Sequence, residues 1–199
     1  MDEATLVAAA QAGKLAAFNE LVVRFQDLAF GVAQRMLMDA DEAADVVQDS
    51  FISAYENLKR LRGDSFKAWL LRIVVNRCYD RLRARQRHPS DHLDDLVERG
   101  AEPRLEHDQP ASPEQMALRA ELRATIERGL ATLPPDQRAA VILYDVQGFS
   151  YEEAALAMDT SLGTMKSRLS RGRAKLRDFL LANGELSPGS IRPEDGAQR

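Results

Sequence analysis

The segment SYEEAALAMDTSLGTMKSRLSRGRAKLRDFLL, residues 150–181, decides the fold of the C-terminal half of the chain. Ser150 and Glu153 form a capping-box pattern, in which the hydroxyl and the carboxylate each pair with a backbone N–H at a helix start. Asp159 and Thr160 then interrupt the helical pattern, and Ser161 can cap a second helix. The segment therefore predicts a helix-turn-helix.

The second of these helices is amphipathic and strongly basic. Its apolar positions recur at helical spacing and form one stripe: Leu162, Met165, Leu169, Leu176 and Phe179. Its cations are Lys166, Arg168, Arg171, Arg173, Lys175 and Arg177. Gly163 lets the backbone approach a phosphate, and Ser167 and Ser170 add short hydrogen-bonding groups. A basic amphipathic helix can also be a solvated or membrane-surface element, but the helix-turn-helix context favours a DNA groove.

Length and composition set wider limits. The chain has 199 residues, 45% hydrophobic and 29% charged, which predicts one or two domains with a sizeable core. The formal net charge is only −4, so the information lies in how the charges are distributed. Cys78 is the single cysteine, no stretch approaches a membrane span, and the N-terminus lacks the basic start of a secretory signal. We therefore expect a cytoplasmic protein.

Two helices are predicted before residue 60. Apolar spacing predicts a long core helix from Leu15 to Leu37, and Asp39 or Asp41 can cap a second one. The inward positions of the second helix are Val46, Val47, Phe51, Ala54, Tyr55 and Leu58.

The second of these helices also carries a stripe of carboxylates. Glu42 is followed at offsets of three, seven and fourteen by Asp45, Asp49 and Glu56, which places them along one side. No Lys or Arg occurs between Met36 and Asn57, so we expect these acids to lack local partners. The stripe is either a solvated face or a docking surface for a basic partner.

The next predicted helix is basic, in contrast to the acidic helix before it. Residues 62–87 contain eight Lys or Arg against Asp64 and Asp80. The predicted buried side is Phe66, Trp69, Leu70, Ile73 and Val74. Asn76 is mildly unfavourable mid-helix and suggests a hydrogen-bonding role. Aromatic rings near cations suit single-stranded nucleic acid, although we expect Trp69 to lie in the core rather than to stack on a base.

The rest of the chain divides by composition. Residues 88–113 are acidic and proline-containing, which predicts a flexible linker, and residues 183–199 predict a disordered tail. Ser112 and Pro113 can start a helix with an apolar stripe, which is formed by Leu118, Leu122, Ile126, Leu130 and Leu133. A further proline-started helix ends at Gly148 and precedes the helix-turn-helix. The expected fold is all-α, with two helical domains at 1–87 and 114–182.

Nothing in the sequence predicts catalysis. Phosphate-loop, zinc-protease and dinucleotide-binding motifs are absent, and the three histidines fall in the linker without metal-ligand spacing. We therefore expect a binding protein with no catalytic residues, no metal and no cofactor.

Three motifs in this order resemble the extracytoplasmic-function sigma factors of bacterial RNA polymerase. They are DEAADVVQDSFISAYENL, RGDSFKAWLLRIVVNRCYDRLRARQR and LPPDQRAAVILYDVQGFSYEEAALAMDTSLGTMKSRLSRGRAKLR. The resemblance implies that residues 1–87 are sigma region 2, which docks on core polymerase and recognises and melts the −10 element. It implies that residues 114–182 are region 4, which reads the −35 element. The implied partners are core polymerase through its β′ coiled coil and β flap, promoter DNA, and an anti-sigma factor.

The resemblance also assigns residues to each contact. The implied polymerase contacts are Asp45, Gln48, Asp49 and Phe51. The implied −10 contacts are Arg62, Asp64, Ser65, Phe66, Asn76, Arg77, Arg81, Arg83 and Arg85. The implied −35 contacts are Gly163, Thr164, Lys166, Ser167, Ser170, Arg171 and Arg173. The loop between Gly63 and Trp69 is one residue shorter than in the commonest family version.

Two other functions fit parts of the sequence. A two-domain transcriptional regulator would use the helix-turn-helix on an operator and the N-terminal helices for sensing or dimerisation. A helical adaptor would use its charges for protein contacts only. The basic helix at residues 66–87 discriminates, because a regulator needs one DNA-binding region whereas a sigma factor needs two on one monomer.

Overall fold

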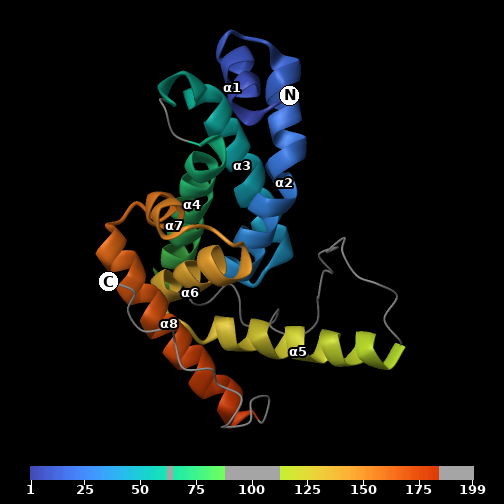
Figure 1. The fold of residues 1–199 in the computed structure, drawn as a ribbon, viewed down its shortest axis with the longest axis vertical. Coiled ribbons are helices and arrows are strands. Elements are labelled where there is room, and N and C mark those ends of the chain that lie inside the picture. The colour runs from blue at the N-terminus through green and yellow to red at the C-terminus, as the bar shows by residue number, and fades with distance from the viewer. Residues whose placement is uncertain (62–64, 88–112, 184–199) are drawn as a thin grey trace.

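The computed structural model describes residues 1–61, 65–87 and 113–183, and within these ranges the chain is helical with no strand. The N-terminal helices are α1 (Glu3–Gln11), α2 (Leu15–Leu37), α3 (Ala40–Asn57) and α4 (Phe66–Arg87), with a 3-10 turn at Leu58–Arg60. The C-terminal helices are α5 (Pro113–Ala131), α6 (Pro135–Val141), a π-helical turn η3 (Ile142–Val146), α7 (Tyr151–Ala157) and α8 (Leu162–Ala182). Figure 1 shows their arrangement.

Side-chain caps fix the starts of α1, α3, α7 and α8. Asp39 Oδ1 accepts the Glu42 N–H at 2.8 Å at the start of α3, as the sequence predicts for one of its two candidates. Asp2 caps α1 in the same way, a short helix that the sequence analysis did not predict. The capping box of Ser150 and Glu153 is present, with distances of 3.1 and 2.9 Å. The predicted helix-turn-helix therefore begins as expected.

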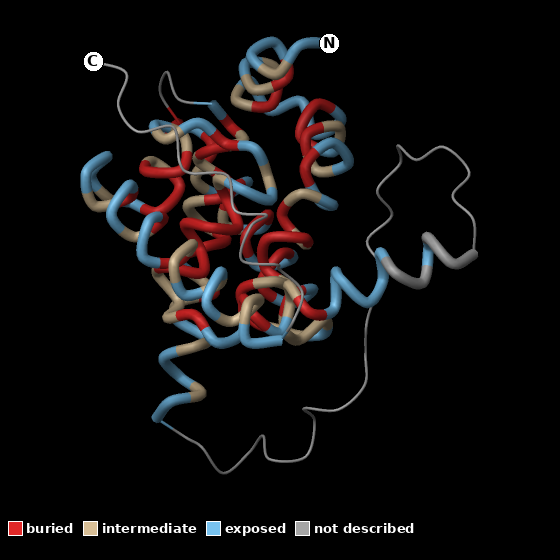
Figure 2. The backbone as a smooth tube through the Cα atoms, turned by 60° about the horizontal axis from the view of Figure 1, so that its bottom comes forward, coloured by how far each residue is buried: buried red, intermediate tan, exposed pale blue. Residues whose placement is uncertain are grey.

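Helices α1–α4 form the first bundle, with α2 packed against the other three. Phe66 at the start of α4 is fully buried, and its ring lies 6.4 Å from that of Phe18 and 5.7 Å from that of Phe25. Trp69 is partly buried beside this cluster, which agrees with its predicted core position. Figure 2 shows buried residues gathered where the helices face one another.

Helices α5–α8 form the second bundle. Ile142, Leu143, Met165 and Leu169 supply its centre, each at most 2% exposed. A Cβ at Gly172 of α8 would lie 2.8 Å from Val141 Cγ2 on α6, so the missing side chain lets these two helices approach closely. Gly148 ends the preceding segment with φ +67°, a conformation that favours glycine.

Four predicted core positions are wrong. Leu15 is 56% exposed, Tyr55 is 49% exposed, Leu122 is 42% exposed and Leu162 is 38% exposed. Each lies on a predicted apolar stripe, but the stripe is wider than the surface that a neighbouring helix covers. The all-α prediction is confirmed for the described residues, whereas nearly all of the predicted linker and of the predicted tail lies outside them.

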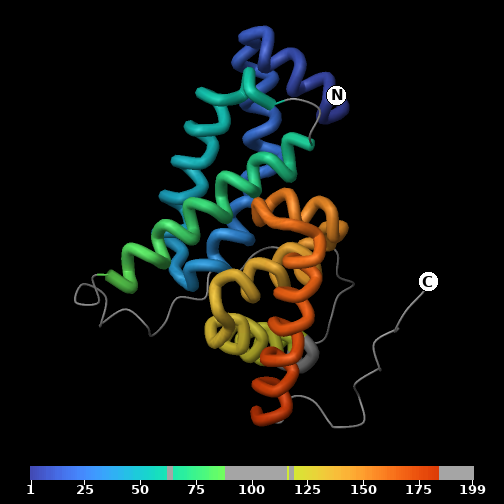
Figure 3. The backbone as a smooth tube through the Cα atoms, turned by 90° about the vertical axis from the view of Figure 1, so that its left-hand side faces the viewer, coloured from blue at the N-terminus to red at the C-terminus, as the bar shows by residue number. Residues whose placement is uncertain are grey.

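The two bundles pack against each other. Helix α7 lies along α4, and α5 and α6 approach α2 near its C-terminal end (Figures 1 and 3). The buried apolar residues of both bundles belong to one continuous cluster. The structure is therefore a closed arrangement in which the helix-turn-helix lies against the basic helix α4.

Candidate nucleic-acid and protein interfaces

The acidic stripe of α3 lies against basic side chains of α4. Arg77 Nη1 is 3.5 Å from Asp49 Oδ2, and Arg81 Nη2 is 3.9 Å from Asp45 Oδ2. The predicted lack of local partners applies to α3 itself, and the partners come from α4, because the sequence pattern does not show that α4 folds back along α3. Exposed ion pairs of this kind contribute only about 0–1 kcal/mol, so either partner can be exchanged for another charged molecule.

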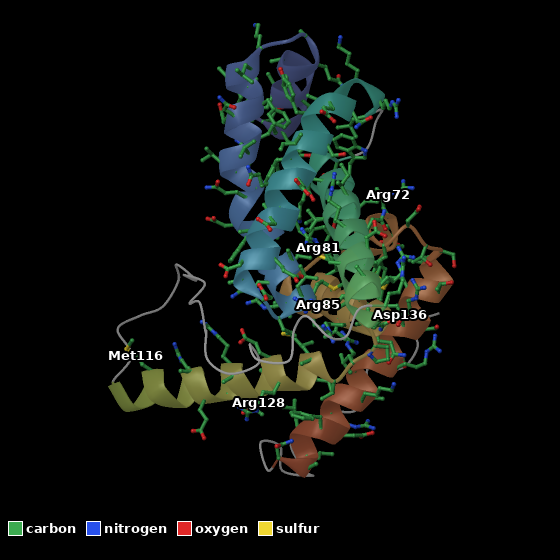
Figure 4. All side chains as sticks on the ribbon, turned by 180° about the vertical axis from the view of Figure 1, so that it is seen from behind. Arg72, Arg81, Arg85, Met116, Arg128 and Asp136 are labelled. Atoms are coloured by element: carbon green, nitrogen blue, oxygen red, sulfur yellow. The ribbon has the colours of Figure 1, made fainter. Side chains whose placement is uncertain are left out.

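Arg85 is held more firmly than the other arginines of α4. Its Nη2 atom lies 2.8 Å from Glu42 Oε2 and 3.7 Å from Asp39 Oδ2, and its Nη1 donates to the Leu37 carbonyl at 2.9 Å. These acceptors lie where α2 ends and α3 begins, and Figure 4 shows Arg85 near that end of the first bundle. A cation is favourable at a helix C-terminus, so Arg85 stabilises the junction.

An apolar groove of about 780 Å³ is lined by residues of α2 and α3. Leu15, Ile52 and Tyr55 lie along it with 56%, 51% and 49% of their surface exposed. Gln48 and Phe51 also line it, whereas Asp45 and Asp49 do not. The four predicted polymerase contacts therefore divide into two in the groove and two in ion pairs with α4. Exposed apolar surface of this kind typically marks a protein contact.

The predicted −10 residues also divide by environment. Arg62 and Asp64 lie outside the described residues. Ser65 is exposed, and its hydroxyl is bonded to Glu3 of α1 at 3.0 Å. Phe66 is fully buried, so its ring cannot stack on a base and we leave it out of the candidate site.

The basic face of α4 supplies the remaining −10 candidates. Asn76 and Arg81 are exposed, and Arg77 is half-buried. Arg83 is exposed and pairs with Asp80 one turn earlier, at 2.7 Å. These groups can donate hydrogen bonds to phosphates, because the ion pairs that hold the arginines are weak and exposed.

The second helix of the helix-turn-helix presents an exposed polar surface at its N-terminal end. Ser161 Oγ accepts the Thr164 N–H at 3.2 Å, which fixes the start of α8. A Cβ at Gly163 would meet nothing within 4 Å, so the surface there is open. The exposed side chains that follow are Lys166, Ser167, Ser170 and Arg171. Backbone N–H groups and cations at a helix N-terminus suit a phosphate-lined groove.

Arg173 differs from the other predicted −35 contacts. Its Nε and Nη2 atoms both bond the Asp145 carboxylate, and its guanidinium lies 5.1 Å from the Tyr144 ring. The hydrogen bonds that Arg173 donates to the Asp145 carboxylate raise the pKa of Arg173 above its usual value. This ion pair links α8 to η3, so Arg173 stabilises the packing of the helix-turn-helix against the preceding helical turn.

Sequence reasoning did not identify two groups that the structure places at interfaces. Ile52 lies one turn after Gln48, and this four-residue spacing would have placed both on the groove side of α3. Arg138 is only 8% exposed and donates to the Met36 carbonyl across the two bundles. No local pattern signals that contact, because the two residues are 102 positions apart.

Among the residues that the structure describes, no group of three or more His, Cys, Asp and Glu could hold a metal ion. None of the described helices combines the length and apolar character needed to traverse a bilayer.

Comparisons with known proteins match both bundles. Residues 21–88 match the family described as Sigma-70 region 2, and residues 123–176 match Sigma-70, region 4. The RNA polymerase sigma-H factor of Pseudomonas aeruginosa is 40% identical over 84% of this chain and 88% of its own length. The ECF RNA polymerase sigma-E factor of Escherichia coli K12 is 39% identical over 87% of this chain and 91% of its own.

Two solved structures also resemble this chain over both bundles. CnrH in complex with the cytosolic domain of CnrY has a TM-score of 0.68 and 27% identity, covering 91% of this chain and 98% of that one. The sigma factor RpoE of Bartonella quintana, in complex with the anti-sigma factor NepR, has a TM-score of 0.63 and 29% identity. That match covers 83% of this chain and 98% of RpoE.

The helix-turn-helix, the basic helix and these matches define a transcription initiation factor rather than an enzyme. The chain belongs to the extracytoplasmic-function sigma factors of the sigma-70 family. It is a sigma factor that directs promoter recognition by RNA polymerase, which confirms the predicted function.

Proposed function

We propose that the first bundle docks this sigma factor on core polymerase and binds the −10 element, while the second bundle binds the −35 element. The observation that carries the proposal is the separation of two polar surfaces on one monomer, on α4 and on the N-terminal part of α8. The domains would span residues 1–87 and 114–182. Because the partner is core polymerase, the protein would act in the cytoplasm.

The polymerase would bind chiefly at the groove between α2 and α3. Half-exposed Ile52 and Tyr55 lie in the groove beside Gln48 and Phe51, and Asp27 and Glu56 line it with negative charge. A partner helix with an apolar face and basic flanks is complementary to this surface. The β′ coiled coil is the proposed occupant, with Asp45 and Asp49 exchanging their α4 partners for basic groups of the polymerase.

The −10 element would meet the exposed polar side of α4. Asn76 is available there as a hydrogen-bonding amide, and Arg77, Arg81 and Arg83 are available for the phosphates of the opened strand. A protein that opens DNA without ATP must offset base unpairing with binding of the exposed strand. The clustered arginines support this role.

The −35 element would meet α8. Gly163, Thr164, Lys166, Ser167, Ser170 and Arg171 are the proposed contacts, whereas Arg173 would position the helix through Asp145. We also propose regulation by an anti-sigma factor. RpoE from Bartonella quintana forms a complex with the anti-sigma factor NepR, and its structure matches 83% of this chain.

Transcription with purified core polymerase tests the assignment of α8. Lys166→Ala with Arg171→Ala should abolish initiation at a promoter that the wild-type protein uses, while binding to core polymerase is unchanged. The matched control is Lys175→Ala with Arg177→Ala, which removes the same charge further along the helix. Equal loss in both double variants would show that only the total charge matters and would contradict the proposed contact surface.

A further inference from the structure

Two stacked tyrosine rings lie beside α8, and a cation of that helix lies over each of them. Tyr144 of η3 and Tyr151, the first residue of α7, have ring centres 4.4 Å apart and 28° between the ring planes. Lys166 Nζ lies 5.0 Å from the centre of the Tyr151 ring. The Arg173 guanidinium lies 5.1 Å from the centre of the Tyr144 ring. The four side chains therefore form one stack, with a cation at each end.

The Arg173 end of this stack is fixed. Arg173 Nε donates to Asp145 Oδ2 at 3.0 Å, and its Nη2 atom donates to Asp145 Oδ1. Such a bidentate, charge-assisted pair is stronger and more directional than a single hydrogen bond between neutral groups. The backbone of Tyr151 is fixed as well, because the capping box of Ser150 and Glu153 sets the start of α7. Both rings therefore have defined positions relative to α8.

Lys166 lies at the exposed end of the stack. A lysine side chain has a flexible stem, and ordering such a side chain on binding lowers affinity by roughly two- to tenfold. The negative face of an aromatic ring attracts an ammonium group and so restricts where it lies. A hydrogen bond with Tyr144 raises the pKa of Tyr151, so the ring remains an uncharged phenol at neutral pH. The Tyr151 ring therefore orders Lys166 before a partner binds.

The ordered ammonium lies on the surface proposed to meet the −35 element. Lys166 is followed there by exposed Ser167, Ser170 and Arg171. In the major groove a lysine can donate to O6 or N7 of guanine, whereas its contacts with phosphates carry no sequence information. A fixed ammonium can favour one base edge, while a mobile one finds a phosphate at any sequence. The position of Lys166 therefore bears on which sequence α8 reads.

We propose that Tyr151, supported by Tyr144, is a positioning residue that holds Lys166 where it donates to a base edge of the −35 element. Tyr151 itself needs no contact with DNA in this arrangement. Arg173 acts at the far end of the stack, since its ion pair with Asp145 keeps the cation over the Tyr144 ring. This inference rests on the proposed −35 role of Lys166.

Proton NMR of the full-length protein tests the contact between Lys166 and Tyr151. An aromatic ring shields protons that lie over its face, so the side-chain methylene protons of Lys166 should resonate upfield of those of exposed Lys175. Tyr151→Leu should return them to the ordinary position. Tyr151→Phe should leave them upfield, because it keeps the aromatic face. Ordinary methylene shifts for Lys166 in the wild-type protein would overturn the proposal.

Transcription with core polymerase tests the effect on sequence reading. The templates are a promoter that the wild-type protein uses and its single-base substitutions across the −35 element. Lys166→Ala should remove the preference at one base pair, which identifies the Lys166 contact. Tyr151→Leu should reduce the preference at that base pair by about two- to tenfold and leave the other preferences unchanged. Tyr151→Phe should retain the wild-type preference.

A double-mutant comparison separates positioning from a structural role. In the Lys166→Ala background, Tyr151→Leu should have no further effect, because the side chain that it positions is absent. Positioning is overturned if Tyr151→Leu lowers initiation equally on all −35 sequences, acts as strongly without Lys166, or increases the preference. An increase would mean that the ring holds Lys166 away from DNA.

The same templates distinguish failure of this inference from failure of the proposed −35 contact. If Lys166→Ala leaves every preference unchanged, the proposed contact fails and the positioning role fails with it. If Lys166→Ala removes a preference that Tyr151→Leu retains in full, the contact stands and positioning alone is overturned.

Discussion

At the scale of single residues, similar side chains in one helix have different environments. Arg83 and Arg85 are two positions apart on α4, yet Arg83 is exposed with one partner, whereas Arg85 is half-buried among acceptors from α2 and α3. The family resemblance implied DNA contacts for both. The sequence shows that both side chains are cationic, but it does not show which groups they contact. The Leu37 carbonyl that accepts a hydrogen bond from Arg85 lies 48 positions away in the chain.

Replacing the two arginines separates stability from DNA binding. We expect Arg85→Ala to lower the free energy of unfolding by about 1–3 kcal/mol, because it removes charge-assisted hydrogen bonds from partly buried acceptors. Arg83→Ala should change stability by less than about 0.5 kcal/mol and weaken promoter opening. Urea unfolding of both variants measures the first effect. Equal destabilisation would show that Arg85 is as dispensable for the fold as Arg83.

Two glycines of α8 give opposite predictions. An added Cβ at Gly172 would lie 2.8 Å from Val141 Cγ2 and 3.0 Å from the Gln137 carbonyl, so Gly172→Ala should destabilise the protein by about 1–3 kcal/mol. Gly163→Ala meets open space and should raise stability by up to about 1 kcal/mol through helix propensity. Thermal unfolding compares them. A stabilising Gly172→Ala would mean that α6 and α8 pack less closely.

Two buried acids predict how stability depends on alkaline pH. Burial raises the pKa of Cys78 from 9.0 to about 12 and that of Tyr79 from 10.0 to about 12. Because the folded state holds both groups neutral, the unfolded chain releases protons first as pH rises. The free energy of unfolding should therefore fall between pH 9 and about 12. Cys78→Ala should reduce the slope of this fall in urea titrations, and an unchanged slope would contradict the assignment.

At the scale of helices, periodicity and capping predicted most of the fold. The bounds of α2 and the starts of α3, α7 and α8 follow from apolar spacing and from Asp39, Ser150 and Ser161. The packing of α3 against α4 could not be predicted in this way. The spacing of residues shows which side of a helix they share, but it does not show which other helix covers that side. The groove between α2 and α3 was missed for the same reason.

The groove can be tested without disturbing the core. Ile52→Glu places a carboxylate among exposed apolar side chains that are already lined by acids, so we expect binding to core polymerase to weaken by at least tenfold. Val23→Glu is the matched control, since Val23 is 68% exposed on α2 but does not line the groove. Fluorescence anisotropy with purified core polymerase measures both. Equal affinities would place the docking surface elsewhere.

At the scale of the whole molecule, charge is segregated although the net charge is only −4. Basic groups lie on α4 and α8, and acids from α3 and the turn before α8 pair with several of them. Composition alone could not predict the closed arrangement, since its contacts join residues more than eighty positions apart.

The most direct test of sigma-factor function is transcription in vitro with core polymerase, with and without this protein, on a pool of promoter fragments from the host genome. We expect protein-dependent, salt-sensitive initiation at sites that share a two-part sequence, and its loss in the Lys166→Ala, Arg171→Ala double variant. Operator binding by the protein alone, with no initiation when polymerase is added, would contradict it.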